Sequence, residues 1–306
     1  MQTCVSMADV MAIRQFLLDS YRIHNGLYNW EPRRWEGLVF HRNDADRLAT
    51  RARIAQTVGI LREPSGFIQG VAIDEYPGGY FLQTIQGDVE SQTQLVAWIV
   101  DEQMITINDT TFAEIWCGEN DIALQDILLS HNFVPTSHHQ IRRHQVLDSS
   151  PTPLAPLPDG YAVRSISSGD DMPSDAQRMA ELLNAAFGRG FHSAEEYQNF
   201  LTLAPSCRTE LEIVVTAPDG SFAAHAGFTA HEEESFVVVE PVCTHPDHQN
   251  LGLARVAMTE GLNRCRALGI RDAYIEAWYS NPVSNHVYQS MGFTEPSSEY
   301  IWRREQ

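Results

Sequence analysis

A proline-rich stretch near the middle of the chain divides it into two halves that share an order of elements. The segment "LDSSPTPLAPLPDGY" (147–161) carries four prolines within eight residues. Proline lacks a backbone N–H and fixes φ, so the segment is predicted to be extended and to lie outside any sheet. We interpret residues 148–160 as a linker between a domain over 1–147 and a second over 161–306, each large enough to bury its own core.

The two halves also resemble each other in sequence pattern. Each opens with an amphipathic helix, "MAIRQFLLDSYR" in the first and "DAQRMAELLNAAF" in the second, and continues with a predicted hairpin. The closest match lies between "AEIWCGENDIALQDILLSHNF" (113–133) and "IEAWYSNPVSNHVYQSMGF" (275–293). The alignment pairs Glu114 with Glu276, Trp116 with Trp278, and Phe133 with Phe293. Agreement in element order favours an internal duplication of one α/β domain over chance similarity.

Composition excludes several classes of protein. A net charge of −19 with no basic stripe argues against a nucleic-acid partner, although it could attract a cationic substrate. No run approaches the roughly 18 to 20 apolar residues that span a bilayer, and the first residues do not form a leader peptide. Five scattered cysteines without a C-x-x-C pair indicate neither a disulfide framework nor a cysteine zinc site. We expect a cytoplasmic monomer or homodimer without a membrane partner.

One segment of the second half combines a strand, a glycine loop and a helix. The β-branched run "ESFVVVEPVCTH" (234–245) leads into "PDHQNLGLA", and apolar residues then recur at helical spacing up to Cys265. This order directs unpaired N–H groups of a helix N-terminus at the loop, where they and the helix dipole form an anion site. Gly252 and Ala254 allow a ligand to approach the backbone closely.

The loop and a second motif carry a family resemblance. Residues 249–254, "QNLGLA", fit the Q/R-x-x-G-x-G/A signature with which the GNAT superfamily of acetyl-CoA-dependent N-acetyltransferases holds the pyrophosphate of coenzyme A. The segment "NPVSNHVYQSMGF" (281–293) resembles a second family pattern, N-x-x-A-x-x-x-Y-x-x-x-G-F, with Ser284 in place of alanine as the one departure. The resemblance covers about 160–306.

The resemblance implies a fold and a number of binding sites. We expect two GNAT-like domains, each a mixed, mostly antiparallel twisted sheet flanked by helices. The first half lacks the pyrophosphate signature, and Asp88 and Glu90 at the corresponding place would repel an anion. We therefore interpret it as a degenerate copy that shapes the acceptor cleft, with one acetyl-CoA per chain.

The resemblance also assigns the residues that contact the cofactor. The pyrophosphate would lie against the loop, and the pantetheine arm would bind the backbone at the end of the preceding strand. The second motif adds two residues, of which Asn281 can equally serve as the cap of the last helix, because Asn followed by Pro is a common helix start. The complete set is Val242, Cys243, Thr244, Gln249, Asn250, Leu251, Gly252, Leu253, Ala254, Asn281 and Ser284.

Acetyl transfer to an amine needs a base for the ammonium group and an acid for the departing thiolate. Tyr288 stands where enzymes of this pattern place the general acid; the alternative is a core tyrosine. Glu240, nine residues before Gln249, is the ionisable residue of the strand "VVVEPV" and is our candidate base, acting directly or through water. Burial in an apolar strand would raise its pKa toward neutrality. The alternative is a carboxylate bonded to a backbone group at the strand edge.

Other conspicuous residues have simpler interpretations. His245, Asp247 and His248 could be metal ligands but are better explained as a polar loop, so no metal is expected. A covalent step at Cys243 is conceivable, although direct transfer is the usual route of the family.

Three further segments leave their roles open. "HEEES" (231–235) is a solvated hairpin tip or an attractor for a cationic acceptor. "NWEPRRWE" (29–36) is a packed loop with arginine stems on aromatic rings, or a wall of the acceptor site or interdomain contact. The acceptor pocket is expected around "FGRGFHSAEEY" (187–197) and the first domain.

These observations predict an N-acetyltransferase that moves the acetyl group of acetyl-CoA to a primary amine of a small molecule or peptide. A different class remains open, a non-catalytic acyl-CoA-binding sensor or assembly module. The fold does not fix the acceptor.

Overall fold

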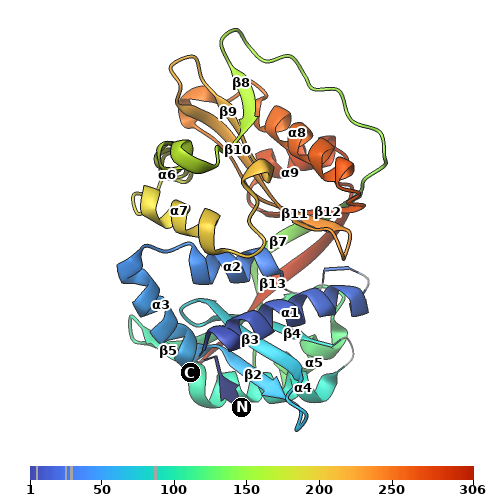
Figure 1. Ribbon diagram of the computed structural model, residues 1–306. Helices are drawn as coiled ribbons and strands as arrows, with labels where there is room; N and C mark the ends of the chain where they lie inside the picture. The colour runs from blue at the N-terminus through green and yellow to red at the C-terminus, as the bar shows by residue number, and fades with distance from the viewer. Residues whose placement is uncertain (5, 25, 28–29, 86–87) are drawn as a thin grey trace.

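The computed structural model describes residues 1–4, 6–24, 26–27, 30–85 and 88–306. One residue of the segments discussed above, Asn29, lies outside this set. Figure 1 shows two lobes, with the N-terminal half below, the C-terminal half above, and α2 and α7 between them. None of the described helices combines the length and apolarity that a membrane crossing requires.

The N-terminal lobe contains both helices and strands, as the hydrophobic periodicity predicts, with three helices before its central strands. Helix α2 begins with Pro32 at a position where the missing N–H is not needed. A π-helical turn, Ile99–Gln103, continues α4. The elements are β1 (Gln2–Thr3), α1 (Met7–His24), α2 (Pro32–Phe40), α3 (Asp44–Thr57), β2 (Gly59–Arg62), β3 (Ile68–Tyr76), β4 (Gly79–Thr84), α4 (Val89–Trp98), β5 (Ile105–Ile107), β6 (Thr110–Gly118), α5 (Ile122–Ser130) and β7 (Val134–Val146).

The linker over 148–160 forms no helix or strand, as its prolines predict, and the C-terminal lobe repeats the order of elements. Short 3-10 turns cover Gly169–Asp171, Thr209–Leu211 and Pro246–His248. The elements are β8 (Ala162–Ser165), α6 (Met172–Phe187), α7 (Ala194–Leu203), β9 (Glu212–Thr216), β10 (Phe222–His231), β11 (Phe236–Thr244), α8 (Leu253–Ala267), β12 (Asp272–Trp278), α9 (Pro282–Ser290) and β13 (Glu295–Glu305).

The two lobes exchange their last strands. Strand β7, the last of the N-terminal half, pairs with β12 of the other lobe, while β13 pairs with β6. The exchanged strands also pair with each other, so the described strands form one continuous sheet in the order β1-β2-β3-β4-β6-β13-β7-β12-β11-β10-β9-β8, with β5 beside β6. The fold class predicted from the sequence is confirmed, but the lobes are joined through their sheets.

Alternating strand residues feed cores on both faces of the sheet. In the N-terminal lobe Ile73 and Phe81 pack toward α1 to α3, whereas Tyr80 and Leu82 pack toward α4 and α5. In the C-terminal lobe one core faces α8 and α9 and another faces α6 and α7. The aligned Trp116 and Trp278 meet where the lobes join, with ring centroids 5.5 Å apart. The contact of these aligned residues is consistent with the predicted duplication.

Candidate active site

Strands β11 and β12 separate soon after they begin. They pair in parallel at only three positions, from Phe236 with Asp272 to Val238 with Tyr274. Beyond Val238 the edge of β11 that faces β12 has no strand partner among the described residues. A bulge on this part of β11 lies opposite Gly227 of β10, and bulges bend the strand that carries them. The result is a wedge-shaped gap between β11 and β12, called the wedge below. Backbone groups line it, and it lies where the pantetheine arm is expected.

The loop before α8 leaves the helix N-terminus open. Asn250 and Gly252 both adopt left-handed backbone conformations, with φ of 64° and 74°. Gly252 is the N-cap and forms no side-chain capping bond, and the first turn carries no acidic residue. A Cβ added at Gly252 would meet no atom within 4 Å, so the space in front of the helix is clear. The first-turn N–H groups of this 15-residue helix can therefore bind a pyrophosphate.

The corresponding helix of the N-terminal lobe is closed to an anion. The N-cap of α4 is Asp88, whose carboxylate accepts hydrogen bonds from the backbone N–H and the hydroxyl of Ser91. Glu90 adds a second negative charge in the first turn. A carboxylate at this position satisfies N–H groups and repels a second anion. This geometry agrees with the prediction that the N-terminal copy is degenerate.

The second motif places Tyr288 beside the wedge. Asn281 caps α9, as its sequence predicts, by accepting a hydrogen bond from the Ser284 N–H at 3.1 Å. Tyr288 lies one turn further on and is 6% exposed. Burial raises its pKa to about 12, opposed by a hydrogen bond with the Ser284 side chain and assisted by the negative charge of Glu240. The hydroxyl therefore keeps its proton at neutral pH and can donate it.

Glu240 lies in a charged environment and not in the apolar one that its strand neighbours predict. Its side chain is 41% exposed, and its carboxylate lies 3.3 Å from the guanidinium Nε of Arg34 on α2. Its backbone carbonyl accepts a hydrogen bond from Arg33 at 3.3 Å. The apolar burial that its strand neighbours predict is thus absent. The side chain is nevertheless accessible to solvent and to an acceptor.

Glu240 belongs to an acidic recess that the N-terminal lobe completes. The recess is lined by Leu27, Glu31, Val238, Val239, Glu240, Tyr274, Ile275 and Glu276. Arg34 reaches it from α2 and lies 2.9 Å from Glu276. Glu31, the N-cap of α2, is buried, and burial together with the charge of Glu240 raises its pKa to about 8. Arg142 of β7 also pairs with Glu276, so the carboxylates of the recess lie among guanidinium groups.

Glu31, Arg33 and Arg34 were not predicted individually from the sequence as residues of the recess. The signal was the crowded segment over 29–36. It was predicted to be a packed loop, but from Pro32 it forms the first turns of α2; its packing in the core and its contact between the lobes are as predicted. Trp30 and Trp35 are buried in the core of the N-terminal lobe. Arg33 and Arg34 cross to the other lobe, and Arg33 lies over the ring of Phe200 with its Cζ 3.9 Å from the centroid.

The remaining candidate residues take structural positions near the wedge. Val242 packs against the core between β11 and α8. Cys243 is buried, and burial raises the pKa of its thiol to about 12, which leaves it a poor nucleophile. His248 forms a hydrogen bond of 2.8 Å with the Tyr161 hydroxyl, and His245 accepts one from the Asp247 N–H. These bonds support the interpretation of the histidines as loop residues.

The hairpin tip over 231–235 is held by ion pairs. Glu232 pairs with Arg208, and Glu233 and Glu234 both pair with Arg22 of α1. The tip therefore links the lobes and is not simply solvated.

Comparison with known proteins agrees with this geometry. Residues 176–293 match the family model described as the acetyltransferase (GNAT) family. No curated protein matches the chain.

Solved structures resemble nearly the whole chain. A GCN5-related N-acetyltransferase from Sphaerobacter thermophilus has a TM-score of 0.63 at 15% identity, covering 99% of this chain and 94% of its own. A GNAT-family acetyltransferase from Colwellia psychrerythraea has a TM-score of 0.58 at 11% identity, covering 99% and 98%. A tandem GNAT protein from the clavulanic acid biosynthesis pathway has a TM-score of 0.57 at 10% identity, covering 89% and 94%.

The family match lies in the half that carries the open helix N-terminus, and the structural likeness extends over both halves. This is a fold that supports acyl transfer. Residues 176–293 therefore match the GNAT family in sequence, and the chain as a whole has the fold of tandem GNAT proteins, with the GNAT fold repeated in the N-terminal half.

Proposed function

We propose that the protein is an N-acetyltransferase that uses acetyl-CoA and acts on a primary amine of a small molecule or peptide. The observation that carries the proposal is the contrast between the two helix N-termini. Helix α8 has a glycine cap and clear space before its first turn, while α4 is capped by Asp88. Only the open terminus suits a pyrophosphate, and it stands beside Tyr288.

The binding roles follow from the chain's own groups. The N–H groups over 250–255 and the α8 dipole would hold the pyrophosphate. Backbone groups of Val242, Cys243 and Thr244, on the unpaired edge of β11, would hold the pantetheine arm. Bound acetyl-CoA supplies an acetyl group activated as a thioester. Asn281 and Ser284 would support this arrangement by fixing the start of α9 and the orientation of Tyr288.

The catalytic roles divide between two side chains. Glu240 would accept the proton of the incoming ammonium group, directly or through water, so that the amine can attack. Tyr288 would donate a proton to the departing sulfur, because its raised pKa keeps it protonated. Direct transfer needs no protein nucleophile, in line with the buried thiol of Cys243.

The acidic recess favours a cationic acceptor. Four carboxylates, those of Glu31, Glu75, Glu240 and Glu276, surround Arg34, and the pKa values of Glu31 and Glu75 are raised by burial and by neighbouring negative charge. A protonated amine entering the recess would be attracted by the carboxylate of Glu240, which is 41% exposed and shares Arg34 with Glu276. The N-terminal lobe would then contribute to acceptor recognition through α2.

The test is a thiol-release assay with acetyl-CoA over a panel of amines, amino acids, aminoglycosides and peptide N-termini. We expect turnover of cationic primary amines, and a loss of about 10²-fold in kcat for Glu240→Gln with coenzyme A affinity unchanged. Glu181→Gln, an exposed change on α6, is the control. Tight acetyl-CoA binding without turnover of any amine would refute the proposal and favour an acyl-CoA sensor.

A further inference from the structure

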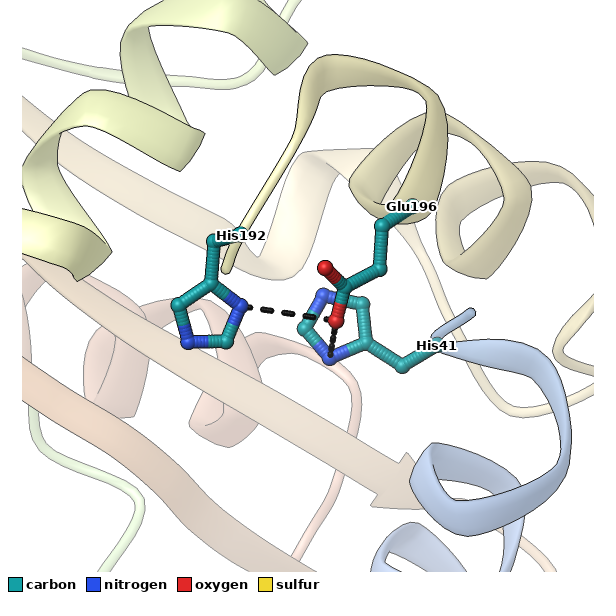
Figure 2. Close-up of side chains that lie close together, drawn as sticks. All are labelled: His41, His192 and Glu196. Atoms are coloured by element: carbon teal, nitrogen blue, oxygen red, sulfur yellow. Dashed lines mark ion pairs between the residues drawn. The ribbon is translucent and has the colours of Figure 1, made fainter. Parts of the chain in front are cut away.

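Three side chains from both halves of the chain converge beside α2 and α7. His41 follows the last residue of α2, while His192 precedes α7 and Glu196 lies in its first turn. Figure 2 shows both imidazole rings and the carboxylate directed at one another. One ligand atom from each side chain lies within 4.8 Å of the other two. This cluster is the one group of potential metal ligands with such spacing among the described residues.

The distances fit a metal better than they fit hydrogen bonds. Glu196 Oε1 lies 3.4 Å from His192 Nδ1 and 3.7 Å from His41 Nδ1. Neither contact forms a hydrogen bond. Tetrahedral zinc, with bonds of roughly 2.0–2.2 Å to nitrogen and oxygen, holds its ligand atoms about 3.4 Å apart. Only a small closing movement of the two rings would therefore complete a coordination sphere.

The cluster also leaves buried polar atoms without partners. The side chains of His192 and Glu196 are each 7% exposed. Both ring nitrogens of His192 and Nε2 of His41 have no hydrogen-bond partner among the described residues. An unpaired buried polar atom is unfavourable, and native structures rarely keep several together. A cation bound among the three groups would satisfy Nδ1 of His192, the nitrogen that lies 3.4 Å from Glu196 Oε1.

The position of Glu196 strengthens this interpretation. Ser193 and Glu196 form the S-x-x-E pattern of a capping box, and the Ser193 hydroxyl accepts a hydrogen bond from the Glu196 N–H at 3.2 Å. In a complete capping box the glutamate would turn back to the N-cap N–H. Here its carboxylate faces the two imidazoles instead.

We propose that His41, His192 and Glu196 form a binding site for one divalent transition-metal ion, with zinc the best fit, that links the two lobes. Two imidazoles and one carboxylate are a common zinc ligand set that leaves a fourth position for water. His41 is 21% exposed, so water can reach the site from its side. The ion would fix the end of α2 against α7, and α2 carries Glu31, Arg33 and Arg34 into the recess. This site is independent of the proposed acetyl transfer.

The experiment uses the full chain, freed of metal by a chelator and titrated with Zn²⁺ by calorimetry and by equilibrium dialysis. We expect one Zn²⁺ per chain and a rise of several degrees in the unfolding temperature, because an ion that binds only the folded state stabilises it. The conservative variants Glu196→Gln and His192→Asn should fold without metal as the wild type does but lose the Zn²⁺-dependent rise.

Two controls locate the site. His138→Asn removes an exposed histidine of β7, and His248→Asn removes one of the loop histidines; both should retain stoichiometric zinc binding. The proposal is wrong if the wild type binds no zinc, if the His41→Asn/His192→Asn double variant binds it as tightly as the wild type, or if His248→Asn abolishes binding.

Discussion

Tyr288 combines burial with access to the wedge in the sheet. The residues around it account for its pKa and for the orientation of its hydroxyl. Burial and the charge of Glu240 raise its pKa to about 12, while Ser284 orients the hydroxyl from one turn earlier in α9. A phenol in such a setting remains a proton donor throughout the neutral range. The role of Tyr288 as an acid can be tested by removing this one oxygen.

Tyr288→Phe should lower kcat by about 10²-fold or more while the affinity for coenzyme A stays within a factor of a few, because proton donation contributes only in the reaction. Steady-state kinetics and calorimetry measure the two quantities. The exposed Tyr279→Phe serves as the control. An unchanged kcat in Tyr288→Phe would show that the residue is a core tyrosine.

A negative charge added at the N-terminal end of α8 should weaken coenzyme A binding, whereas the same charge at the C-terminal end should not. Ala254→Glu introduces a carboxylate in the first turn, where it favours the helix but repels a pyrophosphate. We expect coenzyme A binding to weaken at least tenfold with no loss in unfolding temperature. The matched change Ala267→Glu, exposed at the other end of α8, should leave binding unaltered. Equal affinities in both variants would place the pyrophosphate elsewhere.

Helix α2 is the element that joins the N-terminal core to the active site. Its aromatic side chains pack in the core of the N-terminal lobe. Its N-cap and first turn place Glu31, Arg33 and Arg34 at the recess. The N-cap Glu31 accepts hydrogen bonds from the backbone N–H groups of both arginines. Burial nevertheless dominates and raises its pKa, so this helix start is sensitive to pH.

Glu31 should make stability fall as pH rises. Its pKa is about 8 in the folded protein and 4.5 as the ordinary value, so between these values only the folded state holds the proton. The free energy of unfolding must then decrease from about pH 4.5 to about pH 8 through this group. Glu31→Gln should flatten that decrease in urea titrations across the range, whereas Glu181→Gln should not. A parallel pH profile for Glu31→Gln and the wild type would contradict this assignment.

Local signals predicted the elements that we propose to hold the cofactor. The glycine loop before α8, the Asn–Pro start of α9 and the proline-rich linker each depend on backbone rules that act over a few residues. The contacts between the lobes, including those of the proposed acceptor site, were harder to predict. Arg34 meets Glu240 across 206 residues of sequence, and His41 meets Glu196 across 155. Contacts between residues so far apart in sequence depend on how the two lobes pack. Local sequence patterns do not specify that packing.

At the scale of the whole molecule, the exchange of β7 and β13 joins the two lobes. The duplicated pattern predicted two similar domains, but not which lobe each last strand would join. Each exchanged strand brings an arginine opposite a glutamate of the other lobe: Arg142 lies beside Glu276, and Arg303 beside Glu114. Neither half can complete its own sheet in this arrangement.

Separate halves should therefore fail to fold. Residues 1–147 and 161–306 produced apart would each expose a long unpaired strand edge, and we expect aggregation or no cooperative unfolding. A full chain cleaved within 148–160 is the control, since the exposed linker adds no strand and the exchanged strands should hold the pieces together. Circular dichroism and size-exclusion chromatography measure both. Independent cooperative unfolding of the two halves would contradict the structural role of the exchange.

The central claim is that one of two similar lobes binds acetyl-CoA, because α8 presents an open N-terminus and α4 a capped one. Isothermal titration of the full chain with acetyl-CoA tests this most directly. We predict one molecule bound per chain, with an affinity at least tenfold weaker in Ala254→Glu. A stoichiometry of two, or one site that persists unchanged in Ala254→Glu, would contradict it.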